Sequence, residues 1–182
     1  MIGVIVEGES DEKVIREITR KLGVPAKIRR SRRGATIQSP RKTGSYVVDL
    51  LSDCEKVVIL KDSHCSDPHA KEENLRGRLQ GAGLPVDGDL HICMVVHAIE
   101  SWLLADEEAI SDYLGSKVKE LRDPETECKP EEVLEELFKK TGKVYLKGGE
   151  APRELARRLS VEKLITKCPS FKKFKALIEM SV

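Results

Sequence analysis

Aromatic side chains are scarce in this chain of 182 residues, which contains three Phe, three Tyr and one Trp. Long apolar runs are also missing, since the first one ends after five residues at Glu7. We therefore expect neither a secretory signal peptide nor a membrane span. With 40% apolar and 35% charged residues, the composition is that of a soluble globular protein. The length suits one domain with a full core.

The five cysteines lack the spacing of a metal knuckle. They are odd in number and widely scattered, at Cys54, Cys65, Cys93, Cys128 and Cys168. This pattern predicts reduced thiols in a cytoplasmic protein. A zinc site would need Cys65 together with His64 and His69. We do not expect one, because Pro68 disfavours the helical turn that would join them and no fourth ligand has a matching spacing.

Short apolar strands alternate with helical patterns in the first half of the chain. Strands are expected at residues 2–6, 26–30, 56–61 and 90–97, and apolar residues recur at helical spacing between them. Such strands, without a polar face, are typical of a parallel sheet covered on both sides. From about Asp106 onward the pattern is helical only. The sequence therefore predicts an α/β core over residues 1–105 and a helical extension over 106–182, packed as one unit.

The stretch VIVEGESDEKVI joins the end of the first strand to the start of a helix. Ser10 is expected to cap this helix, with Asp11 and Glu12 in its first turn. Glu9 also suits the helix start. Glu7 differs from these acids because it directly ends a buried strand, where a charged residue rarely belongs to the core. We therefore assign a chemical role to Glu7 alone.

Three of the predicted strands end close to a carboxylate: Glu7, Asp62 and Glu100. Ligands bind at the carboxyl ends of the strands in open parallel sheets, so these side chains should converge. The first loop cannot be a phosphate-binding P-loop, because it has acids where that loop needs glycines and a lysine. Gathered carboxylates instead predict a hard divalent cation such as Mg²⁺, which would let a phosphate approach.

Other residues near these strand ends have two open interpretations. His64 is either a metal ligand or general base, or a loop histidine without a role. Asp67 is expected to cap the helix that starts at Pro68, and is a weaker candidate near the metal. Asp106 is likewise expected to cap a helix, which leaves it in reserve behind Glu100.

Positive charge is concentrated in one basic segment of the chain, residues 27–42, although the net charge is small. The formal net charge is only +1, so affinity for a polyanion must come from such a cluster. The segment holds seven cations and no acid: Lys27, Arg29, Arg30, Arg32, Arg33, Arg41 and Lys42. It predicts contact with a nucleic-acid backbone, and the alternative is a solvated loop that serves solubility. It has no aromatic side chain for stacking, so base recognition is not predicted.

Several stretches resemble a known family. VIVEGESDEKVI and VVILKDSHCSD, in this order on alternating strands, resemble the Toprim domain of topoisomerases, primases and the overcoming-lysogenization-defect nucleases. AIESWLLAD, VYLKGGEAP and SFKKFKALI extend the resemblance over nearly the whole chain, to a Toprim-like family of uncharacterised archaeal and bacterial proteins. The resemblance implies a Rossmann-like sheet of about four parallel strands flanked by helices.

The resemblance also implies roles for single residues. Glu7 matches the family's glutamate, a metal ligand or acid/base group, and Asp62 matches its first aspartate. The second aspartate position holds His64, which brings no negative charge and favours Mn²⁺ over Mg²⁺. In the related nucleases a later acid and a lysine complete the site, and Glu100 and Lys147 are the nearest candidates. The implied catalytic set is Glu7, Asp62, Glu100 and Lys147, and the implied metal ligands are Glu7, Asp62, His64 and Glu100.

Together these features predict a metal-dependent phosphodiester hydrolase of Toprim type, a nuclease acting on DNA or RNA. The resemblance further implies a role in defence against mobile elements beside an ATPase partner, and a homodimer is compatible with the sequence. Two alternatives stay open: a catalytically silent module that binds nucleic acid or an ATPase, and a phosphatase or nucleotide-binding protein. A topoisomerase or primase is excluded, because the chain has no room for the further domains that they need.

Overall fold

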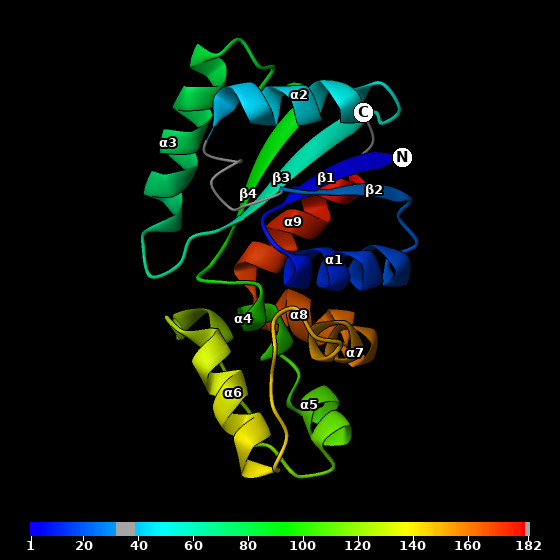
Figure 1. Cartoon of the computed structure of the whole chain (residues 1–182), viewed down its shortest axis with the longest axis vertical. Coiled ribbons are helices and arrows are strands. Elements are labelled where there is room, and N and C mark those ends of the chain that lie inside the picture. Colours follow the sequence, from blue (N-terminus) through cyan, green and yellow to red (C-terminus); the bar gives the residue numbers. More distant parts are fainter. Residues whose placement is uncertain (32–38, 181–182) are drawn as a thin grey trace.

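Four parallel strands form the centre of the protein (Figure 1). The structure, a computed structural model, describes residues 1–31 and 39–180. The strands are β1 (Ile2–Val6), β2 (Ala26–Arg30), β3 (Lys56–Asp62) and β4 (Leu90–Val95). Their order is β2-β1-β3-β4, and every neighbouring pair is parallel. The predicted α/β fold with a four-stranded parallel sheet is confirmed.

Helices cover both faces of this sheet, in two layers. One face packs against α1 (Glu9–Lys21) and α9 (Pro169–Glu179), and the other against α2 (Pro40–Leu51) and α3 (Pro68–Gly81). Successive strand residues point to opposite faces. In β1 this places alternate side chains in two separate apolar clusters, and the whole strand is buried. The strand β1 therefore has no polar face, as the sequence indicated, whereas the edge strand β2 is only partly buried and has exposed arginines at its end.

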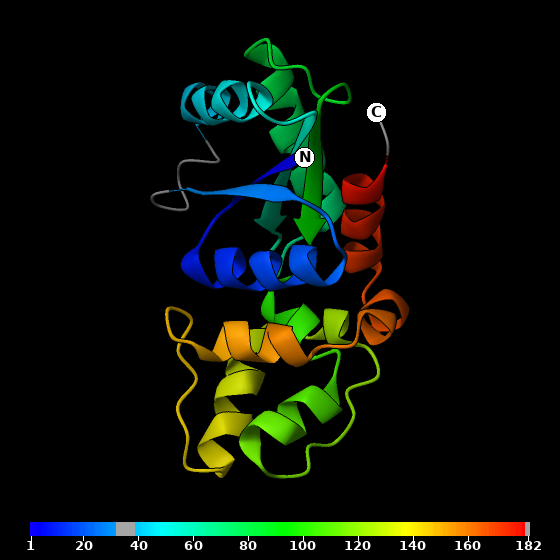
Figure 2. The same ribbon diagram turned by 90° about the vertical axis from the view of Figure 1, so that its right-hand side faces the viewer.

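The remaining helices gather at one end of the molecule, and β4 runs toward them (Figures 1 and 2). They are α4 (Glu100–Leu103), α5 (Glu107–Leu114), the short 3-10 helix η2 (Pro124–Thr126), α6 (Pro130–Lys140), α7 (Ala151–Arg158) and α8 (Val161–Lys167). Trp102 of α4 packs against Phe171 and Phe174 of α9, with ring centroids 5.2 and 5.6 Å apart. The larger apolar cluster thus runs from the sheet into this part. The division at residue 105 stays a prediction.

The helix starts agree with the sequence at two of three places. Asp67 accepts a hydrogen bond from the His69 amide at 2.8 Å, and Asp106 accepts one from the Glu108 amide at 3.2 Å. The prediction that Ser10 caps α1 is wrong. The N-cap is Gly8, whose extended backbone turns the chain directly after the strand and starts the helix earlier.

Two of the cysteines are joined. Cys65, in the loop after β3, forms a disulfide with Cys128, which lies just before α6. The prediction of five reduced thiols is therefore wrong for this pair, whose segments are 63 residues apart and meet only in the folded chain. Cys54, Cys93 and Cys168 are free and buried. Within the described residues, no helix has the length and apolar character needed to span a membrane.

Candidate metal centre at the carboxyl edge of the sheet

The carboxyl ends of β1 and β3 border a small cavity of about 290 Å³, which we call the carboxylate cavity. Its lining includes Glu7, Asp11, Asp62, His64 and Lys147. The last of these comes from the segment between α6 and α7, so the helical part of the chain contributes to the cavity. Four of the five residues are those that the sequence placed in the candidate site, and Asp11 is an addition.

Glu100 lies beside this cavity and is fully buried at the start of α4. Its Oε1 accepts hydrogen bonds from the Ser10 hydroxyl at 3.4 Å and the Tyr145 hydroxyl at 3.1 Å. Its Oε2 has no hydrogen-bond partner among the described residues, and the Lys147 Nζ lies 3.8 Å away. A buried carboxylate oxygen left in this state is costly, so a bound cation would stabilise it.

The carboxylates of this region crowd one another. We call Glu7, Asp11, Asp62 and Glu100 the rim cluster. Burial raises the pKa of Asp62 well above its usual range, and the charges of Asp11, Glu100 and Glu7 raise it further. Burial likewise raises the pKa of Asp11 and of Glu100. Desolvated acids that share a small space are the arrangement that a divalent cation stabilises.

Two lysines supply part of the missing positive charge. Lys61 of β3 forms an ion pair with Glu7, whose other oxygen accepts a 3.3 Å hydrogen bond from the Asp62 amide. Lys147 lies 2.7 Å from Glu131 and 3.8 Å from Glu100. Burial works against the charge of Lys147, but Glu100 and Glu131 together raise its pKa. It therefore stays protonated at neutral pH.

His64 occupies a special backbone position at the edge of the cavity. Its φ of 50° lies in the left-handed region, which few residues other than glycine adopt. The conformation is held by His97, whose carbonyl accepts a 2.7 Å hydrogen bond from the His64 amide and whose Nδ1 lies 2.7 Å from the His64 carbonyl oxygen. Partial burial lowers the pKa of His64, so its ring is neutral at neutral pH. A neutral ring can accept a proton or bind a metal.

Three residues of the region were missed or misjudged from the sequence. Asp11 does serve the helix start, accepting a 2.8 Å hydrogen bond from the Gly8 amide, but it also lines the cavity. Ser10 and Tyr145 both donate hydrogen bonds to Glu100. No local pattern in the sequence marked Tyr145, because its partner Glu100 lies 45 positions earlier in the chain.

The donors fit the chemistry of Mg²⁺ or Mn²⁺, because they are carboxylate oxygens with one imidazole nitrogen. The unpartnered Glu100 oxygen and the raised pKa values support this fit. Over the described ranges, no group of three or more His, Cys, Asp or Glu side chains stands ready to hold an ion. The rim cluster thus offers suitable ligands without a preformed coordination shell.

Comparison with known proteins gives the family. Residues 6–179 match the family described as "Domain of unknown function (DUF4276)". The chain belongs to this family. No curated protein matches it.

One solved structure resembles this DUF4276 chain along almost its whole length. It is the C-terminal region of the Xanthomonas campestris pv. campestris OLD protein, with a TM-score of 0.50 and 16% identity, and the match covers 97% of this chain and 96% of that one. At this identity the likeness shows a shared fold and nothing finer. The shared fold agrees with the Toprim-like architecture predicted from the sequence.

The basic segment of the DUF4276 chain does not form one patch. Lys27 lies at the start of β2 and pairs with Asp53 at 2.6 Å, so it faces the amino edge of the sheet, away from the rim cluster. Arg30 ends β2 and pairs with Glu9 at 3.2 Å, on the carboxyl side. Arg29 lies 5.1 Å from the ring of Tyr46.

The remaining cations of that segment are divided between described and undescribed residues. Arg41 and Lys42 are exposed in the first turn of α2, which begins on the carboxyl side of the sheet. Arg32 and Arg33 lie outside the described residues. Of the described cations, those suited to reach the rim cluster are therefore Arg30, Arg41 and Lys42, and Lys27 is excluded by its place.

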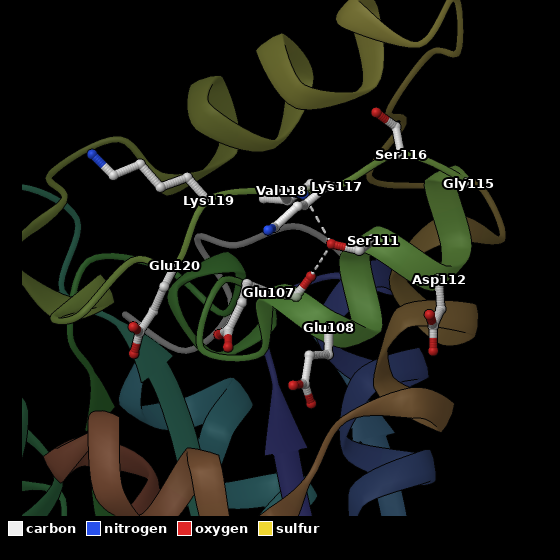
Figure 3. Close-up of a pocket in the computed structure, with 10 residues that line it drawn as sticks. All are labelled: Glu107, Glu108, Ser111, Asp112, Gly115, Ser116, Lys117, Val118, Lys119 and Glu120. Atoms are coloured by element: carbon white, nitrogen blue, oxygen red, sulfur yellow. Dashed lines mark hydrogen bonds between the residues drawn. The ribbon is translucent and has the colours of Figure 1, made fainter.

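A larger cavity of about 800 Å³ lies elsewhere, between α5 and residues 115–120 (Figure 3). Glu107, Glu108 and Glu120 line it, and Ser111 ties its two sides together by accepting a 2.9 Å hydrogen bond from the Val118 amide. Lys163 and Lys167 of α8 lie 3.0 Å from Glu107. Glu107, Glu108 and Glu120 each lie 3.0 Å from Lys163 or Lys167, whereas in the rim cluster the closest ion pair of the buried Glu100 is 3.8 Å long.

Proposed function

We propose that this protein is a divalent-metal-dependent phosphodiester hydrolase of the Toprim type, a nuclease that acts on DNA or RNA. The observation that supports it best is the buried Glu100 oxygen without a partner, next to acids whose pKa values are raised. Glu7, Asp62, His64 and Glu100 would hold Mg²⁺ or Mn²⁺. When bound, such a cation polarises a phosphate and lowers the pKa of a water molecule.

The residues around the rim cluster suit the remaining tasks. Lys147 is charged and lines the carboxylate cavity, so it would bind a phosphate oxygen. His64 is neutral, so its ring would serve either as a metal ligand or as the base that takes the proton of the attacking water, and not as both at once. Lys61 orients Glu7 through their ion pair. Arg41 and Lys42 would contact the nucleic-acid backbone beyond the site.

The test is a cleavage assay with Mg²⁺ and with Mn²⁺, on DNA and RNA, comparing wild type with Glu7→Gln. We expect metal-dependent cleavage by wild type and its loss in the variant, because the amide keeps the shape of Glu7 and removes its charge. Retained cleavage in Glu7→Gln would overturn the site assignment. No cleavage with either metal, with nucleic-acid binding intact, would favour the second candidate.

The second candidate is a catalytically silent Toprim-like module that binds nucleic acid or an ATPase. His64 supports it, because a histidine stands where the Toprim family has its second aspartate. Lys147 also supports it, since its ammonium already lies near Glu100 and Glu131. Such a module would bind nucleic acid equally well with metal or with a chelator, whereas the nuclease requires the metal.

The biological setting is a further part of the proposal. Following the resemblance to the overcoming-lysogenization-defect nucleases, the protein would act in defence against mobile elements together with an ATPase. Co-purification of an ATPase with the intact chain tests the partner. Purified chain without any accompanying ATPase would contradict it. A homodimer would be seen directly as twice the chain mass in light scattering.

A further inference from the structure

A second cavity of about 560 Å³ borders the carboxylate cavity, and the two share Glu7 and His64. We call it the α3 cavity, because one wall is a face of α3 that carries Ala70, Asn74 and Arg78 at intervals of four residues. Residues four apart on a helix lie on one side. The loop after β3 adds His64, Ser66 and Asp67 to the lining.

The charge changes sign between the two cavities. Three cations, Lys61, Lys71 and Arg78, line the α3 cavity against two acids, Glu7 and Asp67. Among the described residues, the carboxylate cavity is lined by four acids, Glu7, Glu9, Asp11 and Asp62, against the one cation Lys147. A polyanion held by a cation at the rim cluster would therefore find its next favourable position in the α3 cavity.

The rest of the lining suits a nucleoside. The side chains of Ala70 and Leu75 give an apolar surface, and the exposed amide of Asn74 offers both a donor and an acceptor. A volume of about 560 Å³ lies within the usual range for small organic ligands. Among the described residues, no Phe, Tyr or Trp lines the cavity, so the only ring on which a base could stack there is that of His64.

We propose that the α3 cavity binds one unpaired nucleotide of the substrate, next to the phosphate held at the rim cluster. This inference rests on the proposed nuclease function and names its substrate class: single strands or frayed ends. A base inside a duplex is stacked and paired, and it must leave the stack before it can enter such a recess. The interior of a duplex is therefore a poor substrate.

The test measures binding of a fluorescent single-stranded oligonucleotide and of the blunt duplex with the same sequence, by anisotropy in Ca²⁺. Asn74→Glu places a negative charge in the α3 cavity, and Gln80→Glu makes the same charge change on the same helix outside it. We expect Asn74→Glu to weaken single-strand binding about tenfold or more, and Gln80→Glu to leave it unchanged. Ala70→Leu, which fills the space without a charge, should act as Asn74→Glu does.

Other results would overturn the inference. It fails if wild type binds the duplex as tightly as the single strand, or if the cavity variants bind like Gln80→Glu. It also fails if inorganic phosphate competes as well as a mononucleotide does, because the cavity is then an anion site only. Cleavage within duplexes at the single-strand rate would refute the α3 cavity and keep the nuclease. Single-strand binding in the α3 cavity without any cleavage would refute the nuclease and keep the α3 cavity as a nucleotide site.

Discussion

Two acidic regions of the molecule differ in what surrounds them. At the rim cluster, Asp62 and Glu100 are buried among other acids, and desolvation raises the pKa of both. Beside α5, burial alone would raise the pKa of Glu107, but its own backbone amide, Lys163 and Lys167 lower it to about 2. The difference shows that the number of acids does not mark a site. What marks it is charge that the protein leaves unneutralised.

Cavity size alone would have placed the functional site beside α5 and not at the rim cluster. The cavity beside Glu107 is the larger, at about 800 Å³, and the carboxylate cavity has about 290 Å³ (Figure 3). We call Asp106 and Glu107, with Lys163 and Lys167, the extension cluster. Its ion pairs hold α5 to α8, and Asp106 also caps α5. Its acids are therefore explained by structure, whereas the rim cluster contains a buried Glu100 oxygen without a hydrogen-bond partner among the described residues.

The largest expected difference is in cleavage rate, between a variant with one neutralised acid in the rim cluster and a variant with one neutralised acid beside α5. Asp62→Asn should reduce metal-dependent cleavage by at least about 100-fold, because a carboxylate that would hold the metal is lost. Glu107→Gln, an equal change in charge, should cleave like wild type. Initial rates on a single-stranded oligonucleotide in Mn²⁺ measure both. Equal rates for the two variants would mean that the rim cluster has no catalytic role.

The two regions are also stabilised by different kinds of bond. A reductant should therefore affect the region next to the disulfide and leave the other unchanged. The disulfide joins Cys65, next to His64, to Cys128, while the extension cluster relies on ion pairs. Closing a loop of this length is worth about 2–4 kcal/mol of unfolding free energy. A reductant should therefore lower stability by that amount and speed hydrogen exchange at residues 63–67 and 127–131 but not at 160–167.

Thiol counting provides the control for this prediction. The unreduced, unfolded protein should show three reactive thiols, and the double variant Cys65→Ser with Cys128→Ser should show the same three and no response to reductant. Five reactive thiols in the wild type before reduction would contradict the disulfide.

The strand ends could be predicted from the sequence, and the contacts between distant segments could not. Glu7 directly follows an apolar run and Asp62 follows one after Lys61, so the topology of a parallel sheet places them together without further information. Asp11 had a sufficient local explanation at the helix start, and its second role depends on how Gly8 turns the chain. No local pattern pointed to the Tyr145–Glu100 hydrogen bond, which joins residues 45 apart.

In the absence of metal, the same two substitutions should change stability in opposite directions. Asp62→Asn removes a desolvated charge that its neighbours repel, so it should raise the free energy of unfolding by about 1–2 kcal/mol. Glu107→Gln removes a charge that two lysines stabilise, so it should lower that free energy by about the same amount. Urea unfolding in a chelator measures both. Mn²⁺ should then stabilise wild type and leave Asp62→Asn unaffected.

The smallest effect, and the most specific, is the pH at which each difference appears. The folded pKa of Glu107 is lowered to about 2, so its stabilisation is present above its unfolded pKa of about 4.3 and is lost as the pH falls below it. The folded pKa of Asp62 is raised, so its contribution is present below about 3.9 and is lost as the pH rises. The Asp62→Asn difference from wild type should therefore change as the pH rises above about 4, and the Glu107→Gln difference as the pH falls below about 4. Unfolding curves across both windows measure this, and a shared window would mean that the two regions are electrostatically alike.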